Sequence, residues 1–344
     1  RLPPTGISRT YERIYLLALA IPFVSVLGIG LAWILQRQHR SRLIRQGFTP
    51  EQTERMVNVR DASSEPTHPN WWILGGSVAF VLFTLAVGLG SFPYREEIVF
   101  AGSMAIVLFL MLRLVRELEP DKRFTLVGTA VVVFIFRAIP GTGPGTTWWM
   151  IDELKFDQQF LSVLSLIGST LTLAGMFVFR CFMAERSIAY VVGFLTFVGT
   201  ILTLPIVSMY YGFHEWTARL TGGVVDARFI ALIDTALESP LGQISMIPML
   251  VWIANSAPAH LKATFFAVMA SFTNLALSLS QLGTKYLNDV YVVTREVRDP
   301  ASGAIQTPAD YSQLGDLLIL QLILGLALPF AAIAFAKVTR FKSA

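Results

Sequence analysis

The chain has 344 residues, of which 54% are hydrophobic and only 15% are charged, and its formal net charge is +4 at pH 7. Soluble domains of this size keep about a quarter of their residues charged, so the composition excludes a soluble globular protein and indicates a polytopic membrane protein. The positive excess does not indicate nucleic-acid binding, because the arginines gather in short connections between apolar runs. The single cysteine, Cys181, excludes an internal disulfide, and the scattered histidines predict no metal cluster.

Apolar runs long enough to cross a bilayer recur along the chain, and we expect about nine transmembrane helices in an all-α bundle. Their expected ranges are Ile14–Gln36, Trp71–Phe92, Ile98–Val115, Phe124–Met150, Phe160–Phe182, Ile188–Tyr210, Phe229–Asn255, Ala263–Leu287 and Leu317–Ala336.

The connection at residues 37–70 is dense in arginine. Basic residues in such loops mark the cytoplasmic side, so we expect this connection and, by alternation, the carboxy terminus to be cytoplasmic. The same alternation places Arg1 outside. Because residues 1–10 are no signal peptide, we expect the chain to be amino-terminally incomplete, with further helices upstream. Within the connection, Thr49-Pro50-Glu51-Gln52 predicts a capped start for a short interfacial helix at Pro50–Val57.

The stretch from Phe124 to Asp157 interrupts an apolar run with one arginine, Arg137, and then with several Gly and Pro residues. A helix from Phe124 to Ile139 would measure about 24 Å, against about 30 Å of hydrocarbon. We therefore expect one broken crossing with Arg137 near mid-depth, its freed backbone groups satisfied by protein or by a water-filled cavity. Discontinuous helices of this kind mark substrate sites in secondary transporters. Trp148, beyond the break, either stacks on a flat substrate ring or belongs to an aromatic belt.

The run that opens at Phe229 carries Asp234 and Glu238, which share one helix face because they are four residues apart. Counting inward from Asp226, we expect them roughly 9 Å and roughly 15 Å deep, which brings Glu238 to the depth of Arg137. Charges at such depths are costly and must face each other, a cavity or a ligand. One hypothesis is that Arg137 alternates between a carboxylate of this helix and an anionic substrate, and that Glu238 or Asp234 then takes up a proton. The alternative is a static ion pair that joins two helices.

Polar side chains also occur inside the later apolar runs, at Gln243, Ser245, Asn274, Ser278 and Gln281. Such groups usually hydrogen-bond between helices, and Gln243 and Asn274 are the ones that we expect to reach a ligand. The sequence contains no Walker motif, nucleophile elbow or metal-ligand spacing. We therefore expect neither an enzyme nor an ATPase, and no cofactor or metal.

Several segments of the carboxy-terminal part form a recognisable set. They are Pro240–Leu250, Ala257–Pro258, Ala263–Ala267 and Leu282–Gly283, together with Ser271 and Asn274. As a set they resemble the folate-biopterin transporter family of the major facilitator superfamily, and Phe134–Leu161 resembles that family's seventh crossing. The resemblance covers roughly residues 124–337. Lys262 departs from the family pattern, because an acidic residue is expected at its position.

The resemblance implies a major-facilitator-like bundle of two six-helix halves around a central cavity, and proton symport of folates or other pterins by alternating access. The last six predicted crossings form two three-helix sets, which open with Phe124–Met150 and Phe229–Asn255. In that superfamily the opening helix of each three-helix set lines the cavity, and Arg137, Asp234 and Glu238 lie on these two opening helices. Arginine suits a carboxylate of folate, and the acidic pair suits the N–H donors of a pterin ring. The expected substrate-binding residues are Arg137, Asp234, Glu238, Trp148, Gln243 and Asn274, and the expected proton-coupling residues are Glu238 and Asp234.

The same resemblance predicts how the chain is divided into segments. Residues 1–36 are expected to be the last helix of an amino-terminal half that is mostly missing, and residues 37–70 a cytoplasmic basic loop. Residues 71–116 are expected to form an extra transmembrane hairpin, and residues 117–344 the carboxy-terminal six-helix half. The expected location is a bacterial inner membrane, or a cyanobacterial or plastid-type membrane.

Two other functions stay open at this point. One is a facilitator for a different small organic anion. The other is a non-transporting factor for membrane-complex assembly or pigment delivery, which predicts a partner in a membrane complex. Charges deep in two corresponding helices favour transport, because they are costly in a purely structural role. The expected partners are therefore a small organic anion and the lipid bilayer, and nucleic acid is not expected.

Overall fold

The computed structural model describes residues 16–49, 52, 71–91, 93–116, 118–179, 182, 186–242, 262–299 and 302–339. These residues are almost all helical, which agrees with the predicted all-α membrane protein. The chain separates into two units, Arg1–His68 and Pro69–Ala344.

The first unit contains one long helix, α2 (Ala20–Arg45), whose described side chains are almost all exposed. The helix continues past the predicted end of this crossing at Gln36, so that boundary was wrong. Arginine and glutamine are good helix formers, and the basic residues that follow Gln36 extend the helix instead of starting a loop. It ends only before Gly47, which adopts the left-handed conformation with φ of +93°.

A reciprocal pair of hydrogen bonds follows α2 and matches the predicted capped helix start. The Thr49 amide donates to Gln52 Oε1 at 3.1 Å, and the Gln52 amide donates to Thr49 Oγ1 at 3.3 Å. This is the geometry of a capping box, in which each side chain satisfies a backbone donor of the other residue. The remainder of the predicted Pro50–Val57 helix lies outside the described residues.

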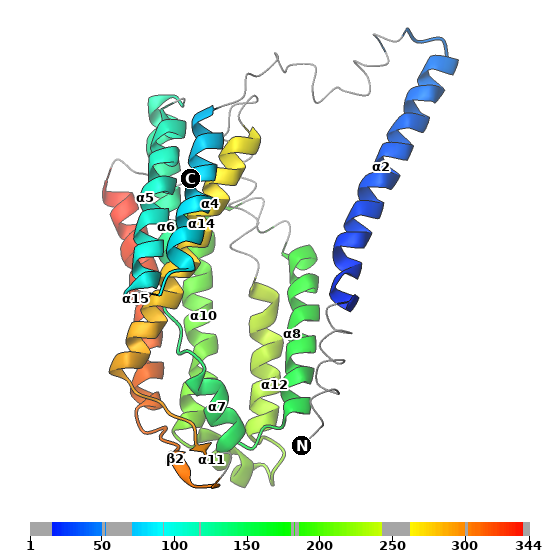
Figure 1. Cartoon of the computed structure of the whole chain (residues 1–344). Coiled ribbons are helices and arrows are strands. Elements are labelled where there is room, and N and C mark those ends of the chain that lie inside the picture. The colour runs from blue at the N-terminus through cyan, green and yellow to red at the C-terminus, as the bar shows by residue number, and fades with distance from the viewer. Residues whose placement is uncertain are drawn as a thin grey trace. The chain divides into compact units, whose positions relative to one another are not determined.

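The second unit holds the other helices and one short hairpin of strands (Figure 1). Its elements are α4 (Trp71–Gly88), α5 (Arg95–Val115), α6 (Pro120–Arg137), α7 (Gly145–Asp152), α8 (Gln158–Val178), α10 (Ile188–Tyr210), α11 (Phe213–Leu220), α12 (Ala227–Glu238), the 3-10 turn η1 (Ser239–Leu241), α14 (Lys262–Val290), β1 (Val297–Arg298), β2 (Ile305–Thr307) and α15 (Leu314–Val338). The two strands pair antiparallel in the loop between α14 and α15.

Seven helices in the described part of the chain are long and apolar enough to cross a membrane, so the expected nine are not confirmed. Six of the seven belong to the second unit: α4, α5, α8, α10, α14 and α15. The two remaining predicted crossings correspond to α6 with α7 and to α12. α6 begins with charged residues and stops at Arg137, and α12 has only 12 residues before the 3-10 turn. Neither forms one uninterrupted apolar helix.

The helices that follow residue 117 pack in a reciprocal pattern. α6 packs on α14 and α15, whereas α12 packs on α8 and α10, and α10 packs on α15. Each opening helix therefore contacts the second and third helices of the other set. Two structural repeats that are related by a two-fold axis produce this reciprocal packing. The hairpin of α4 and α5 packs on α14 and does not take part in the reciprocal packing.

The reciprocal packing requires a close approach between α8 and the 3-10 turn after α12. Gly175 of α8 is buried, and a Cβ atom at this position would overlap the carbonyl of Pro240. Thr172, one turn earlier, donates from Oγ1 to the Ser239 carbonyl at 2.8 Å. A small residue at position 175 is therefore a condition for this contact.

We expect Gly175→Ala to destabilise the protein by about 1–3 kcal/mol, because its methyl group must displace the backbone of η1. The control is Gly199→Ala in α10, where an added Cβ meets no atom within 4 Å. That substitution should be neutral or stabilising, since alanine is the better helix former. Thermal unfolding of the purified variants in detergent measures both, and equal melting temperatures would contradict the contact.

Candidate functional site

The predicted break in the crossing after Phe124 is present in the structure. α6 ends at Arg137, residues 139–144 are not helical, and α7 begins at Gly145. Figure 1 shows the connecting coil continuing from α6 towards the end of the bundle that carries α7, α11 and β2. The predicted break therefore separates two helices, α6 and α7.

A row of polar side chains on α14 satisfies the backbone of this break. Ser280 Oγ donates to the Ile139 carbonyl at 2.6 Å, and the Gly141 amide donates to Thr284 Oγ1 at 2.8 Å. Asn288 Nδ2 lies 3.4 Å from the Thr142 carbonyl and donates to it. Backbone groups freed inside a membrane must find such partners in the protein.

The three α14 residues that hold the break were missed by the sequence reasoning. Ser280, Thr284 and Asn288 are four residues apart, so they form one row on a helix. That spacing was available as a signal in an otherwise apolar run. Their partners in the break lie about 140 residues earlier, and only the tertiary fold shows that the two segments meet.

Arg137 is the last residue of α6 and is half-buried. Its Nε atom is buried and makes no hydrogen bond. The position is electrostatically favourable, because the carboxyl end of a helix carries a partial negative charge. The carboxyl end of α6 therefore stabilises the positive charge of Arg137, and the Nε–H group of this residue has no acceptor.

Asp234 and Glu238 lie on α12, whose amino end is fixed by Asp226. The Asp226 carboxylate accepts a hydrogen bond from the Phe229 amide at 2.8 Å. Asp234 is half-buried, and its Oδ1 atom is buried without a hydrogen-bond partner. Glu238 is exposed and is the last residue of α12, directly before η1. Each opening helix thus stops at one of the predicted charged residues, Arg137 in α6 and Glu238 in α12.

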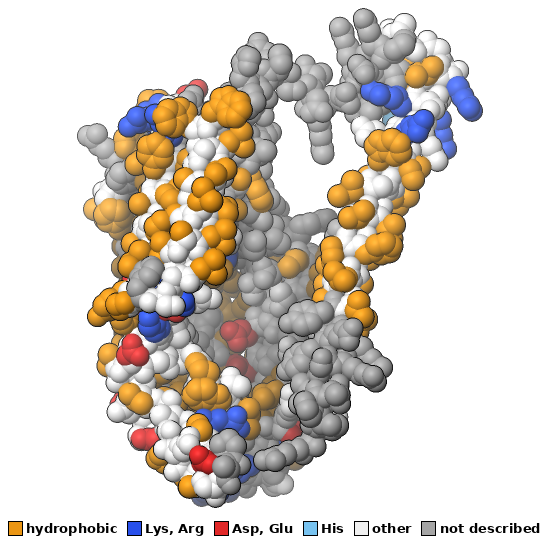
Figure 2. Space-filling model, in the orientation of Figure 1, with side chains coloured by type: hydrophobic (Ala, Val, Ile, Leu, Met, Phe, Trp, Pro, Cys, Tyr) orange, Lys and Arg blue, Asp and Glu red, His pale blue; other side chains and the backbone are white. Residues whose placement is uncertain are grey.

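The structure does not pair these charges with each other. Within the described ranges, no ion pair joins Arg137 to Asp234 or Glu238. α6 and α12 both pack on α10, and their contact with each other is at most slight. Figure 2 shows acidic side chains set back in a recess of the molecular surface beside α12. The acidic residues of α12 and the unpaired Arg137 of α6 therefore lie on two helices that both pack on α10.

The remaining predicted site residues are spread over other positions. Trp148 is half-buried on α7, whereas its neighbour Trp149 is buried, with its ring centre 5.7 Å from that of Tyr210. Asn274 is exposed on α14. Gln243 lies outside the described residues, so the structure does not place it.

A charged cluster ties α7 to the loop between α14 and α15. Arg295 donates to both oxygens of Asp152, from Nε at 3.0 Å and from Nη2 at 2.9 Å, and Tyr311 OH donates to Asp152 Oδ2 at 2.6 Å. Partial burial would raise the pKa of Asp152, but the hydrogen bonds from Arg295 and Tyr311 outweigh burial and hold this pKa below its usual value. Burial and the bond to Asp152 raise the pKa of Tyr311. The far end of the broken crossing is thereby fixed to the loop.

Comparisons with known proteins give a consistent result. A model of the BT1 family matches residues 91–340. The chain is 26% identical over 156 residues to "Folate-biopterin transporter" of Synechocystis sp., a match that covers 45% of this chain and 30% of the relative. It is 25% identical over 167 residues to "Putative folate transporter 2" of Plasmodium berghei, covering 47% of this chain and 34% of the relative. The matches thus span about a third of these relatives. No solved structure matches the chain.

We expect Thr284→Val to destabilise the protein by about 1–3 kcal/mol, because it leaves the Gly141 amide unpaired inside the break. Thr170→Val in α8 is the control, since the Thr170 hydroxyl donates to the Leu166 carbonyl of its own helix. Thermal unfolding in detergent compares the two. If Thr170→Val destabilises as much as Thr284→Val, the break does not depend on α14.

We expect Asp152→Asn to lower the melting temperature by a few degrees at about pH 7. Because the folded pKa of Asp152 is lowered, its stabilisation is present above the unfolded value of about 3.9 and is lost as pH falls through the folded value. The difference from the wild type should therefore shrink towards about pH 3. Glu153→Gln is the control, because Glu153 forms no ion pair with a described residue. A difference independent of pH would contradict the charged cluster.

Proposed function

Because the chain belongs to the BT1 family, we propose that it transports folate- or pterin-type organic anions across a membrane. The family match agrees with the resemblance inferred from the carboxy-terminal motifs, and the chain is an integral membrane protein with several apolar helices. The relatives reported above carry folate or folate-biopterin transporter in their names, which supports this class of substrate. The observation that carries the proposal is that the two opening helices each end at a predicted charged residue, α6 at Arg137 and α12 at Glu238.

Arg137 is proposed to bind a carboxylate of the substrate. A guanidinium is permanently charged and matches a carboxylate with two parallel hydrogen bonds. Its position at the carboxyl end of α6 stabilises the positive charge. Its Nε–H group has no acceptor, which favours a role in ligand binding. Folate carries carboxylates, whereas an unconjugated pterin would depend more on contacts to its ring. Trp148, Gln243 and Asn274 are retained as proposed contacts of that kind.

Glu238 and Asp234 are proposed to couple transport to protons. A negative charge at the carboxyl end of a helix is unfavourable, so the end of α12 disfavours an ionised Glu238. Asp234 lies one turn away on the same face, and two neighbouring anions repel each other. Together these effects favour the uptake of a proton by one acid of the pair when no cation is near. Binding of the proton and of the anionic substrate in the same step gives symport.

The orientation of the chain is also a proposal. The basic carboxyl end of α2 and the basic residues after α15 support a cytoplasmic location for both, because positive charge accumulates on that side. Substrate would then enter the recess from either side as the helices move, which is the meaning of alternating access. A bacterial inner membrane or a plastid-type membrane is the proposed location.

We expect the full chain, reconstituted in proteoliposomes, to take up radiolabelled folate faster under an inward proton gradient. Arg137→Ala should lower this uptake roughly tenfold or more, the factor that corresponds to the loss of a charge-assisted hydrogen bond. Glu238→Gln should remove the dependence on the gradient. Arg219→Ala and Glu215→Gln are the matched controls, because these residues form an exposed ion pair on α11 and should leave uptake unchanged.

Three outcomes would count against the proposal. Full gradient dependence in Glu238→Gln would reject proton coupling through this residue. Uptake of a radiolabelled dicarboxylate that neither folate nor pterin inhibits would assign a different anion as substrate. Absence of any flux, together with co-purification of a pigment-protein complex, would reject transport altogether.

A further inference from the structure

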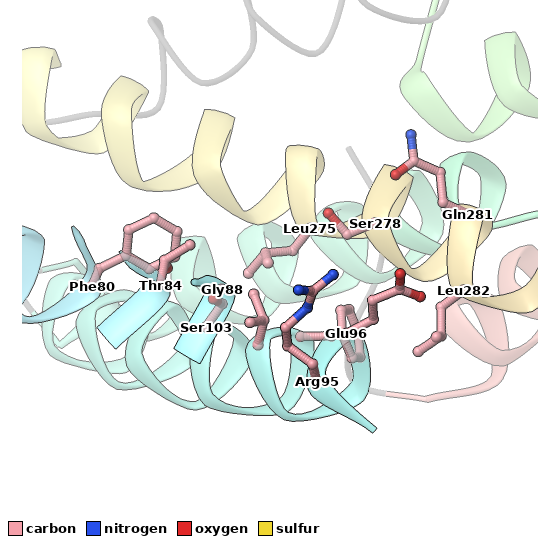
Figure 3. A pocket seen from close by; sticks show the side chains of 12 residues that line it. Phe80, Thr84, Gly88, Arg95, Glu96, Ser103, Leu275, Ser278, Gln281 and Leu282 are labelled. Atoms are coloured by element: carbon pink, nitrogen blue, oxygen red, sulfur yellow. The ribbon is translucent and has the colours of Figure 1, made fainter. Parts of the chain in front are cut away.

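A second hollow of about 550 Å³ lies between the α4–α5 hairpin and α14 (Figure 3). Its charged side chains are Arg95 and Glu96, from the first turn of α5. Ser278 and Gln281 of α14 add polar groups, and Phe80 and Phe100 add apolar surface. The hollow thus has charged, polar and apolar walls from three helices, and it is separate from the acidic pair on α12.

The charged and apolar parts of the hollow lie at different depths. α5 is one of the helices long enough to cross the membrane, and it begins at Arg95. Arg95 and Glu96 therefore lie at the end of a membrane span, whereas Phe100 lies about 7.5 Å further along the helix axis. The polar end faces the boundary between lipid and water, and the apolar part lies at the depth of acyl chains. A molecule that fills the hollow must itself be amphiphilic.

Arg95 forms no salt bridge with the neighbouring acids of the described residues. Lys285 of α14 binds Glu96 and Glu97, with each nitrogen–oxygen distance 3.1 Å. Tyr286 OH also donates to Glu97, at 2.8 Å. Arg95 itself donates only to the Gly90 carbonyl, at 3.3 Å, and no carboxylate of the described residues pairs with it. The lysine thus binds both acids, and the Arg95 guanidinium keeps donors that an external acceptor can use.

Polar side chains of α4 and α5 also line the hollow. Thr84 of α4 lines it, and the buried Oγ1 of this residue has no hydrogen-bond partner. Figure 3 shows the guanidinium of Arg95 extending from α5 towards α14, where Ser278 lies.

We propose that this hollow binds a membrane phospholipid. The phosphate pairs with Arg95, for which a guanidinium offers two parallel donors, and Ser278 and Gln281 donate to the remaining headgroup oxygens. An acyl chain covers Phe80 and Phe100. The ligand joins the hairpin to α14, the helix that also holds the broken crossing.

Native mass spectrometry of the full chain, purified in detergent and then incubated with phosphatidylglycerol or phosphatidylethanolamine, tests the proposal. We expect one tightly retained phospholipid on the wild type, and roughly tenfold lower retention in Arg95→Ala, as loss of a charge-assisted hydrogen bond predicts. Arg219→Ala, which removes an exposed arginine far along the chain, should retain the lipid. Ser278→Phe keeps Arg95 but fills the hollow, so it should also lose the lipid.

The same measurement separates the phospholipid from other anions. Inorganic phosphate or folate at the same concentration should not displace the lipid, because neither covers the apolar wall. Displacement by folate would overturn the proposal and assign the hollow to a soluble anion. Equal retention in the wild type, Arg95→Ala and Ser278→Phe would overturn it as well, since the lipid would then be bound elsewhere.

Discussion

The backbone of residues 139–144 imposes the constraint on which the rest of the structure depends. Inside a bilayer each freed amide and carbonyl must find a partner within the protein, because lipid offers none. α14 supplies these partners to the break after α6, and Thr172 of α8 supplies one to the turn after α12. The two interruptions are therefore held by the second helix of the opposite set. The reciprocal packing of the bundle follows from this requirement.

Each interruption comes directly after a charged residue. The electrostatic effect of the helix end is favourable for one of these residues and unfavourable for the other. A carboxyl terminus carries a partial negative charge, which stabilises the guanidinium of Arg137 and destabilises an ionised Glu238. The first residue is a permanent cation, whereas the second can relieve its unfavourable position by binding a proton. An interrupted helix thus does more than expose backbone groups. It places the fixed charge at a stable position and the titratable charge at an unstable one.

The sequence predicted the features that arise locally and failed where distant segments decide the outcome. Gly and Pro residues after Arg137 predicted the break, and the spacing of Asp234 and Glu238 predicted their shared face. The end of α2 was misplaced because a loop was inferred from arginines that extend a helix just as well. The partners of the break could not be predicted, since polar residues at helical spacing do not reveal which segment they meet. Pairing of Arg137 with an acid depends on the relative positions of α6 and α12, which periodicity does not encode.

The composition of α14 follows from its contacts on two sides. Its mean hydropathy of 1.4 is the lowest of the seven candidate spans, and 39% of its most apolar window is buried, the largest share among them. One row of its polar residues faces the break, and a neighbouring row with Ser278 and Gln281 faces the hairpin. The side chains of a membrane helix that face lipid must be apolar, so the mean hydropathy of a helix rises with its lipid-facing surface. A helix that is enclosed by protein can therefore carry hydroxyl and amide groups. A weakly apolar span within a strongly apolar chain therefore indicates a central helix, and here it indicates the one that positions both the break and the hollow.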